Sequence, residues 1–113
     1  MLRIKKLFSI FVIAGLLSSA FSQEAKNALL IANSDYSEIK SLSQPVPEGE
    51  ELKTALESIG FSVMFVKNAN RDEMFDSLLE FRNKTKKAGG IAFFHYGGHA
   101  VQIDGKNYLI PIN

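Results

Sequence analysis

Apolar residues in this chain gather in short runs, separated by polar, glycine-containing or proline-containing stretches. Residues 28–32 (ALLIA) form a continuous apolar run of the length expected for a strand buried on both faces. Residues 61–66 (FSVMFV) and 91–96 (IAFFHY) are runs of the same kind. The hydrophobic pattern therefore predicts three strands of a sheet that is covered on both sides.

Between these runs, apolar positions recur at spacings of three and four, which is typical of a helix with one apolar face. Residues 48–59 predict the first helix, and Gly60 follows at the position that favours a helix end. Its apolar face would consist of Leu52, Ala55, Leu56 and Ile59. Asn70 and Glu73 form a capping-box pattern that predicts a second helix running to about Lys87. Its buried face would consist of Met74, Phe75, Leu78, Leu79 and Phe81.

The last part of the chain predicts a β-hairpin, formed by residues 101–103 and 107–110 around Asp104-Gly105. The order strand, helix, strand, helix, strand, hairpin is typical of an α/β fold with a parallel sheet and right-handed crossovers. Functional groups of such sheets gather at the carboxyl ends of the strands. Residues 33–36 and 97–100 both follow strands at that edge.

The first 22 residues have the pattern of a secretory signal peptide. Basic residues within 3–6 precede an uncharged apolar stretch, residues 7–17, and Ala20 and Ser22 then stand at the −3 and −1 positions of a small-residue cleavage site. The apolar stretch is short against the roughly 20 residues needed to cross a bilayer, which makes a membrane anchor the weaker alternative. We therefore expect export to the periplasm or the extracellular space, with no stable membrane anchor after cleavage.

Composition and charge narrow the classes of function. The 113 residues are 46% hydrophobic and 22% charged, which suits one small domain. Removal of residues 1–22 takes three of the 13 basic residues and none of the 12 acidic ones, so the net charge changes from +1 to about −2. No basic face remains that would indicate nucleic-acid binding. The sequence contains no cysteine, so it holds no disulfide, thiolate metal site or cysteine nucleophile, and we expect no cofactor.

The turn at residues 96–100 (YGGHA) presents the most informative polar side chain, the imidazole of His99. Imidazole is the commonest general acid or base in catalysis. Gly97 and Gly98 carry no side chains, so a substrate carbonyl could approach the turn closely. From the local pattern alone, a loop histidine without a chemical role is an equally good interpretation.

Three other chemistries have weaker support. His95 and His99 have an HxxxH spacing, but two imidazoles at that spacing share a face only in a helix, which the glycine pair precludes. We therefore expect no metal site, and a hydrogen-bonded core position for His95. Ser34 and Ser37 lack the GxSxG surroundings of a nucleophilic serine and favour turn or capping roles. A small-anion site of the flavodoxin type would need a glycine-rich loop after the first strand, and residues 32–34 contain no glycine.

Several of these segments together resemble the N-terminal half of a caspase-like domain of peptidase family C14, of the bacterial caspase and metacaspase kind. The resemblance lies in ALLIANSDY, in PVPE at the start of a helix, in GFSV, and above all in FFHYGGHAVQIDGKNYLIPIN. It covers about residues 26–113. It implies a three-layer α/β/α parallel sheet, similar to flavodoxin and truncated here after the third strand and a β-hairpin.

The resemblance also implies roles for the residues of the turn. His99 would be the catalytic histidine that pairs with a cysteine thiolate. The backbone N–H of Ala100 would be one donor of the oxyanion hole, with Gly97 and Gly98 as the supporting turn.

A substrate pocket near Glu48 and Asp35 is implied in the same way. Arginine-cleaving relatives carry an acidic residue close to the position of Glu48, and the arginine of aspartate-cleaving caspases falls here on Leu42. The resemblance therefore favours a basic substrate residue before the cleaved bond over an aspartate.

In the family, a fourth strand that ends in the nucleophilic cysteine follows the hairpin, and this sequence ends at Asn113 before it. We therefore expect an open apolar edge on the third strand. We also expect an exported cysteine endopeptidase part that is inactive alone and acts on peptides or proteins once completed. The alternative is a non-catalytic pseudo-protease or binding module that docks on a full-length caspase-like relative.

Overall fold

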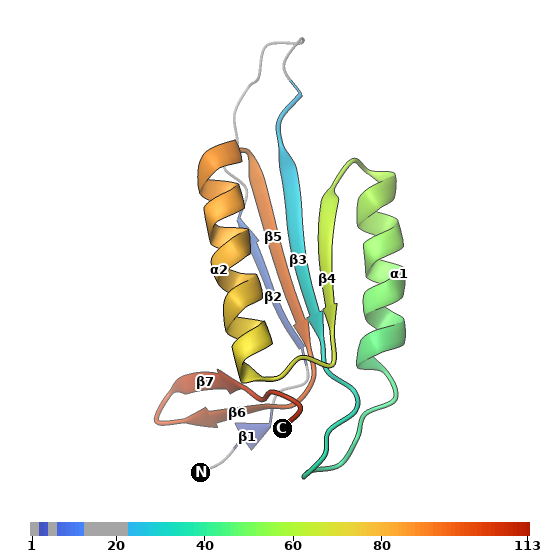
Figure 1. Ribbon diagram of the computed structural model, residues 1–113, viewed down its shortest axis with the longest axis vertical. Helices are drawn as coiled ribbons and strands as arrows, with labels where there is room; N and C mark the ends of the chain where they lie inside the picture. The colour runs from blue at the N-terminus through green and yellow to red at the C-terminus, as the bar shows by residue number, and fades with distance from the viewer. Residues whose placement is uncertain (1–2, 5–6, 13–22) are drawn as a thin grey trace.

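The computed structural model describes residues 3–4, 7–12 and 23–113 of the chain (Figure 1). The cleavage site expected at Ala20 and Ser22 lies outside the described residues, so the signal peptide stays a prediction. In the part of the chain that the structure describes, no helix is long and apolar enough to cross a membrane.

A four-stranded sheet in the order β2, β5, β3, β4 forms the middle of the molecule. β3 (Lys26–Ala32), β4 (Ser62–Lys67) and β5 (Ile91–Gly97) run parallel to one another, as predicted. β3 lies between the other two and pairs with β5 along its whole length, from Lys26 opposite Ile91 to Ala32 opposite Gly97. The carboxyl ends of the three strands consequently share one edge.

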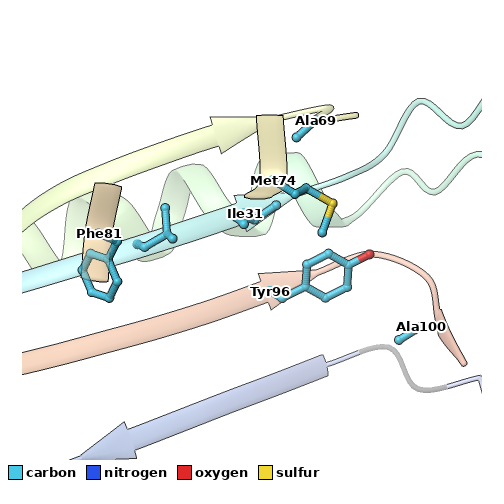
Figure 2. Packing of buried hydrophobic residues seen from close by; sticks show 7 residues of the cluster. Ile31, Ala69, Met74, Phe81, Tyr96 and Ala100 are labelled. Carbon is cyan, nitrogen blue, oxygen red and sulfur yellow. The ribbon is translucent and has the colours of Figure 1, made fainter. Parts of the chain in front are cut away.

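Helices α1 (Pro45–Ser58) and α2 (Arg71–Ala88) cover opposite faces of the sheet, and successive residues of β3 face alternate helices (Figure 1). On the α2 side, Leu29 and Ile31 pack with Met74, Phe81 and Tyr96. Figure 2 shows the Tyr96 ring beside this cluster, with its hydroxyl pointing past the end of β5.

On the α1 side, Ala28 and Leu30 pack with Leu56 and Phe93. The two clusters make β3 the common centre of both cores. The three-layer α/β/α arrangement expected from the sequence is confirmed.

Helix α1 begins at Pro45 rather than at the predicted Glu48, because the first turn of a helix tolerates proline, whose missing N–H has no intrahelical partner there. Its buried stripe includes Gly49 and Leu56, with Leu52 half-buried. A Cβ at Gly49 would lie 2.7 Å from a ring carbon of Phe65, so the helix approaches the sheet closely along this stripe. The expected apolar face is therefore too wide: Ala55 and Ile59 are exposed.

Helix α2 begins with the predicted capping box. The N–H of Glu73 donates to Asn70 Oδ1 at 2.9 Å, and the N–H of Asn70 donates to Glu73 Oε1 at 3.3 Å. Met74, Ser77 and Phe81 face the sheet at spacings of three and four. The predicted buried face is only partly correct, since residues to one side of this stripe around the helix do not reach the sheet. The exposed members are Phe75, Leu78 and Leu79.

Strands β6 (Ala100–Ile103) and β7 (Lys106–Leu109) form the predicted hairpin. Asp104 and Gly105 have φ values of 50° and 77°, as a two-residue hairpin turn with left-handed backbone requires.

The N-terminal segment adds one antiparallel strand to the four-stranded sheet and one to the β6–β7 hairpin, which together with it forms a three-stranded sheet. β2 (Leu7–Val12) pairs with β5, and β1 (Arg3–Ile4) pairs with β6 (Figure 1). The expectation that the third strand has an open edge is therefore wrong for the 113-residue chain, because the apolar residues 7–12 occupy that edge.

Candidate active site

The loop after β3 and the turn after β5 meet at the carboxyl edge of the sheet, as predicted. The backbone N–H of Asn33 donates to the Gly97 carbonyl at 2.8 Å. The rings of Tyr36 and His99 meet edge to face, with centroids 4.7 Å apart. The turn that carries His99 is thus held against the first loop of the domain.

Two tyrosine hydroxyls hold the backbone of His99. The hydroxyl oxygens of Tyr36 and Tyr96 are 3.1 Å apart. The His99 N–H donates to the Tyr36 hydroxyl at 2.8 Å, and the Tyr96 hydroxyl donates to the His99 carbonyl at 2.6 Å. The Ile110 carbonyl lies 3.0 to 3.1 Å from both hydroxyl oxygens, so this pair also joins the segment after β7 to the turn.

The Tyr96 hydroxyl keeps its proton in this position. Burial raises the pKa of Tyr96 well above the ordinary phenol value of 10.0, and the hydrogen bond with Tyr36 raises it further. The hydroxyl can therefore act as the donor to the His99 carbonyl at any physiological pH.

The orientation of the His99 ring defines its tautomer. His99 Nε2 lies 2.7 Å from the backbone carbonyl of Lys40. A carbonyl can only accept, so Nε2 carries a proton, and in the neutral ring Nδ1 is then the unprotonated acceptor. Nδ1 is consequently the ring nitrogen that can accept a proton.

Gly98 allows the tyrosine pair to lie directly beneath the turn. A Cβ at this position would be 2.5 Å from the Tyr96 hydroxyl and 2.6 Å from the Tyr36 hydroxyl, and the residue has a φ of +154°. No side chain fits there without displacing one of the hydroxyls. The glycine that the sequence analysis assigned to substrate approach is thus also required by the packing below it.

A cavity of about 430 Å³ adjoins the turn. It is lined by residues 40–45 of the loop before α1, by Glu48, and by Gly97 and Gly98. Glu48 lies in the first turn of α1 and is exposed. Its negative charge raises the pKa of His95 in β5, so the carboxylate lies at the end of α1 that is near the His99 turn. Leu42 contributes an apolar side chain to this lining.

Asp35 does not line this cavity. It is exposed, and its Oδ2 accepts a hydrogen bond from Asn68 Nδ2 at 3.0 Å. Asn68 Oδ1 in turn accepts from the backbone N–H groups of Ser34 and Asp35. Of the two acidic residues predicted for a substrate pocket, the structure places only Glu48 beside the His99 turn.

The other predicted positions have structural partners. The Ser34 hydroxyl accepts from the N–H of Val46 in the first turn of α1, and the Ser37 hydroxyl donates to the Ile112 carbonyl, in keeping with the turn and capping roles expected. Ala100 is the first residue of β6, opposite Leu109. The oxyanion role of its N–H stays a prediction.

Asn33 was not singled out by the sequence analysis, although it is fully buried. Its Oδ1 accepts from the Ala69 N–H at 2.8 Å, and its Nδ2 donates to the Ile110 carbonyl at 3.3 Å and approaches Met74 Sδ at 3.6 Å. Tyr36 was missed as well. The available signal was a polar residue directly after a buried strand for Asn33, and an aromatic residue in the loop that follows it for Tyr36.

His95 is buried in β5, and burial lowers its pKa below the ordinary value of 6.5, with the charge of Glu48 opposing part of this change. Among residues 3–4, 7–12 and 23–113, no three side chains of the types that bind metal ions come close enough to hold one.

A parallel sheet with a histidine turn at its carboxyl edge, beside a cavity at a helix start, is the arrangement of a caspase-like domain. The model of the caspase domain family, Peptidase C14, matches residues 25–113. The chain therefore belongs to the caspase domain family, and the resemblance found in the sequence is confirmed.

Two curated proteins are similar over most of the chain. They are the mucosa-associated lymphoid tissue lymphoma translocation protein 1 of Homo sapiens and its homolog of Mus musculus, each 30% identical over 88 residues, or 78% of this chain. The chain spans only 11% and 10% of the lengths of these two relatives.

Replacement of Gly98 by alanine should destabilise the domain more than replacement of Gly105. Both glycines have positive φ, but only at Gly98 would the new methyl group press on the two tyrosine hydroxyls, whereas nothing lies within 4 Å of it at Gly105. We expect Gly98→Ala to lower the free energy of unfolding by about 1–3 kcal/mol more than Gly105→Ala. Urea denaturation of both variants measures this difference, and equal losses would contradict the packing described.

The pH dependence of stability should report on His95. Because its pKa is lower in the folded chain than the reference value of 6.5, the unfolded chain binds protons more readily. Stability from the neutral imidazole is fully present above that reference value and is lost as the pH falls through the folded pKa. Urea denaturation between neutral pH and about pH 5, where most carboxylates stay ionised, should show a smaller loss for His95→Gln than for the unchanged chain. The same loss in both would disprove this role.

Proposed function

We propose that this chain supplies the histidine and one wall of the substrate pocket of an exported caspase-type cysteine endopeptidase, and that it hydrolyses no peptide bond alone. The observation that carries the proposal is the orientation of His99, with Nε2 bonded to the Lys40 carbonyl and Nδ1 left as a base. The sequence contains no cysteine, so the thiol comes from polypeptide outside these 113 residues.

In the proposed reaction, His99 Nδ1 takes the proton of that cysteine thiol, and the thiolate attacks the carbonyl carbon of the substrate. The Lys40 carbonyl stabilises the resulting imidazolium because it accepts the Nε2–H. The imidazolium then gives the Nδ1 proton to the leaving amine as the C–N bond breaks. Water hydrolyses the acyl-enzyme with the same nitrogen acting as base.

The turn supports the remaining steps. The N–H of Ala100 is proposed to donate to the oxyanion, together with a donor from the absent part of the site. Gly97 and Gly98 line the cavity without side chains, which leaves room for the substrate carbonyl. The two tyrosine hydroxyls bind the backbone N–H and carbonyl of His99, and these hydrogen bonds limit movement of the base during the reaction.

Substrate preference is proposed from the lining of the cavity. Glu48 and Leu42 both line it, and the resemblance implies that Leu42 takes the position of the arginine of aspartate-cleaving caspases. Lys40 also lines the cavity, and its backbone carbonyl accepts a hydrogen bond from His99 Nε2. A basic substrate residue before the cleaved bond fits this lining better than an aspartate does.

The alternative is a non-catalytic pseudo-protease that docks on a full-length caspase-like relative. The absence of cysteine from the sequence favours this alternative, because His99 then has no thiol within the chain to activate. The histidine turn would in that case have a structural role only. Peptidase activity separates the two candidates.

The purified 113-residue chain should not hydrolyse arginyl, lysyl or aspartyl peptides. A longer product of the same reading frame, reaching an apolar strand that ends in cysteine, should hydrolyse arginyl peptides. Its His99→Ala variant should lose about 10²- to 10⁴-fold in kcat/KM, the usual contribution of a general base. Ser37→Ala, which removes a hydroxyl that donates to the Ile112 carbonyl and not to His99, is the control. Hydrolysis by the 113-residue chain that depends on His99 would overturn the need for a separate thiol.

The role of Glu48 is testable by binding without catalysis. A blocked arginine amide should shift the amide resonances of Gly97 and Gly98, and Glu48→Gln should weaken its binding about tenfold, equal to about 1.4 kcal/mol. Glu51→Gln, on the same helix but outside the cavity lining, should leave binding unchanged. A blocked aspartate amide that binds as tightly as the arginine amide would contradict the proposed preference.

A further inference from the structure

Residues 3–12 carry two properties at once. The sequence predicts that they belong to a removable leader, and the structure pairs residues 3–4 with β6 and residues 7–12 with β5. We propose that this segment is a displaceable cover, and that the uncovered edge of β5 binds an extended apolar strand from a second polypeptide. The proposal rests on the proposed export only for the step that removes the cover.

The described residues of the cover pair with strands on both sides of the His99 turn. β2 pairs with every residue from Ala92 to Gly97, with Leu7 opposite Gly97 and Val12 opposite Ala92. β1 continues on the far side, with Ile4 opposite Val101. The pairing leaves no stretch of the β5 edge between residues 92 and 97 open to another strand.

The two outer edges of the three parallel strands differ in how they resist pairing. The β4 edge has charged side chains at both ends, since Lys67 pairs with Glu50 at 3.2 Å and Lys84 donates to Ser62 Oγ at 3.2 Å. Lysines beside an edge strand discourage pairing with other chains. β5 contains no lysine, arginine, aspartate or glutamate. The covered edge is therefore the one that lacks protection of its own.

The parallel strands have packing that does not depend on the cover. The two clusters centred on β3 join β3, β4 and β5 to α1 and α2. β2 lies outermost in the sheet, and its strand partner is β5. Displacement of the cover would therefore remove the ladders that β1 and β2 make with β6 and β5, and the two clusters would still join the helices to the parallel strands.

β2 also indicates the chemistry of the partner strand. Its sequence, LFSIFV, is uncharged, and Ser9 stands opposite the buried His95. A strand of about this length, apolar and with a small polar residue opposite His95, would reproduce the ladder. A charged side chain beside the uncharged β5 would lose its hydration on pairing and weaken binding.

The test uses the full chain with the cover disrupted by Ser9→Pro together with Ile10→Pro. Neighbouring N–H groups of a strand point to opposite sides, so one of the two prolines removes a donor that faces β5. Gln23→Pro with Glu24→Pro, outside the paired strands, is the matched control. The probe is a fluorescent peptide of residues 3–12 (RIKKLFSIFV), followed by anisotropy.

We expect the cover variant to bind this peptide at least tenfold more tightly than the unchanged chain and the control, with hydrogen exchange of β5 amides slowed by the peptide. A peptide with Phe8→Lys and Ile10→Lys should not bind. Equal binding by all three proteins, or equal binding of the charged peptide, overturns the proposal. Loss of exchange protection in β3 of the cover variant also overturns it, because β2 would then be an obligatory strand. These measurements do not use peptidase activity, so their failure is separable from failure of the proposed function.

Discussion

The paired hydroxyls of Tyr36 and Tyr96 are the interaction on which the candidate active site depends. They join the loop after β3, the turn after β5 and the carbonyl of Ile110, three segments far apart in the sequence. They also bind the backbone N–H and the backbone carbonyl of His99. Buried hydroxyls require such partners, so the position of the His99 turn follows from satisfied hydrogen bonding in the core. The bare Gly98 is the condition that permits it.

The parts of the fold that local chemistry determines were predictable from the sequence. The apolar runs predicted the parallel strands, and Asn70 predicted the start of α2 through a capping box that involves only residues near it. The buried faces of the helices were less predictable, because the sheet decides how wide a stripe is covered. Phe75 is exposed although it fits the helical spacing. The partner of the His99 ring could not be predicted, since a backbone carbonyl such as that of Lys40 leaves no mark in the sequence.

Residues of the same chemical type have different roles in different parts of this structure. Residues 7–12 have the apolar character of a leader and equally that of an edge strand, and the sequence alone supports either interpretation. Asp35 and Glu48 both stand near the carboxyl edge, but Asn68 binds the former and leaves the latter beside the cavity. In each case a neighbour that is distant in the sequence decides the role, which explains why family resemblance predicted the fold better than the details of the pocket.

Asn33 has a consequence for the accuracy of folding. Its side chain is completely buried, and it finds partners at Ala69 and Ile110 only when β3 is aligned as observed. A shift of β3 by one residue would exchange the residues that face the two helices and would strand this amide among apolar side chains. The apolar side chains of residues 28–32 make no hydrogen bonds that would oppose such a slip. One amide at its end therefore acts as a selector against misaligned sheets, penalising the wrong structures more than it stabilises the right one.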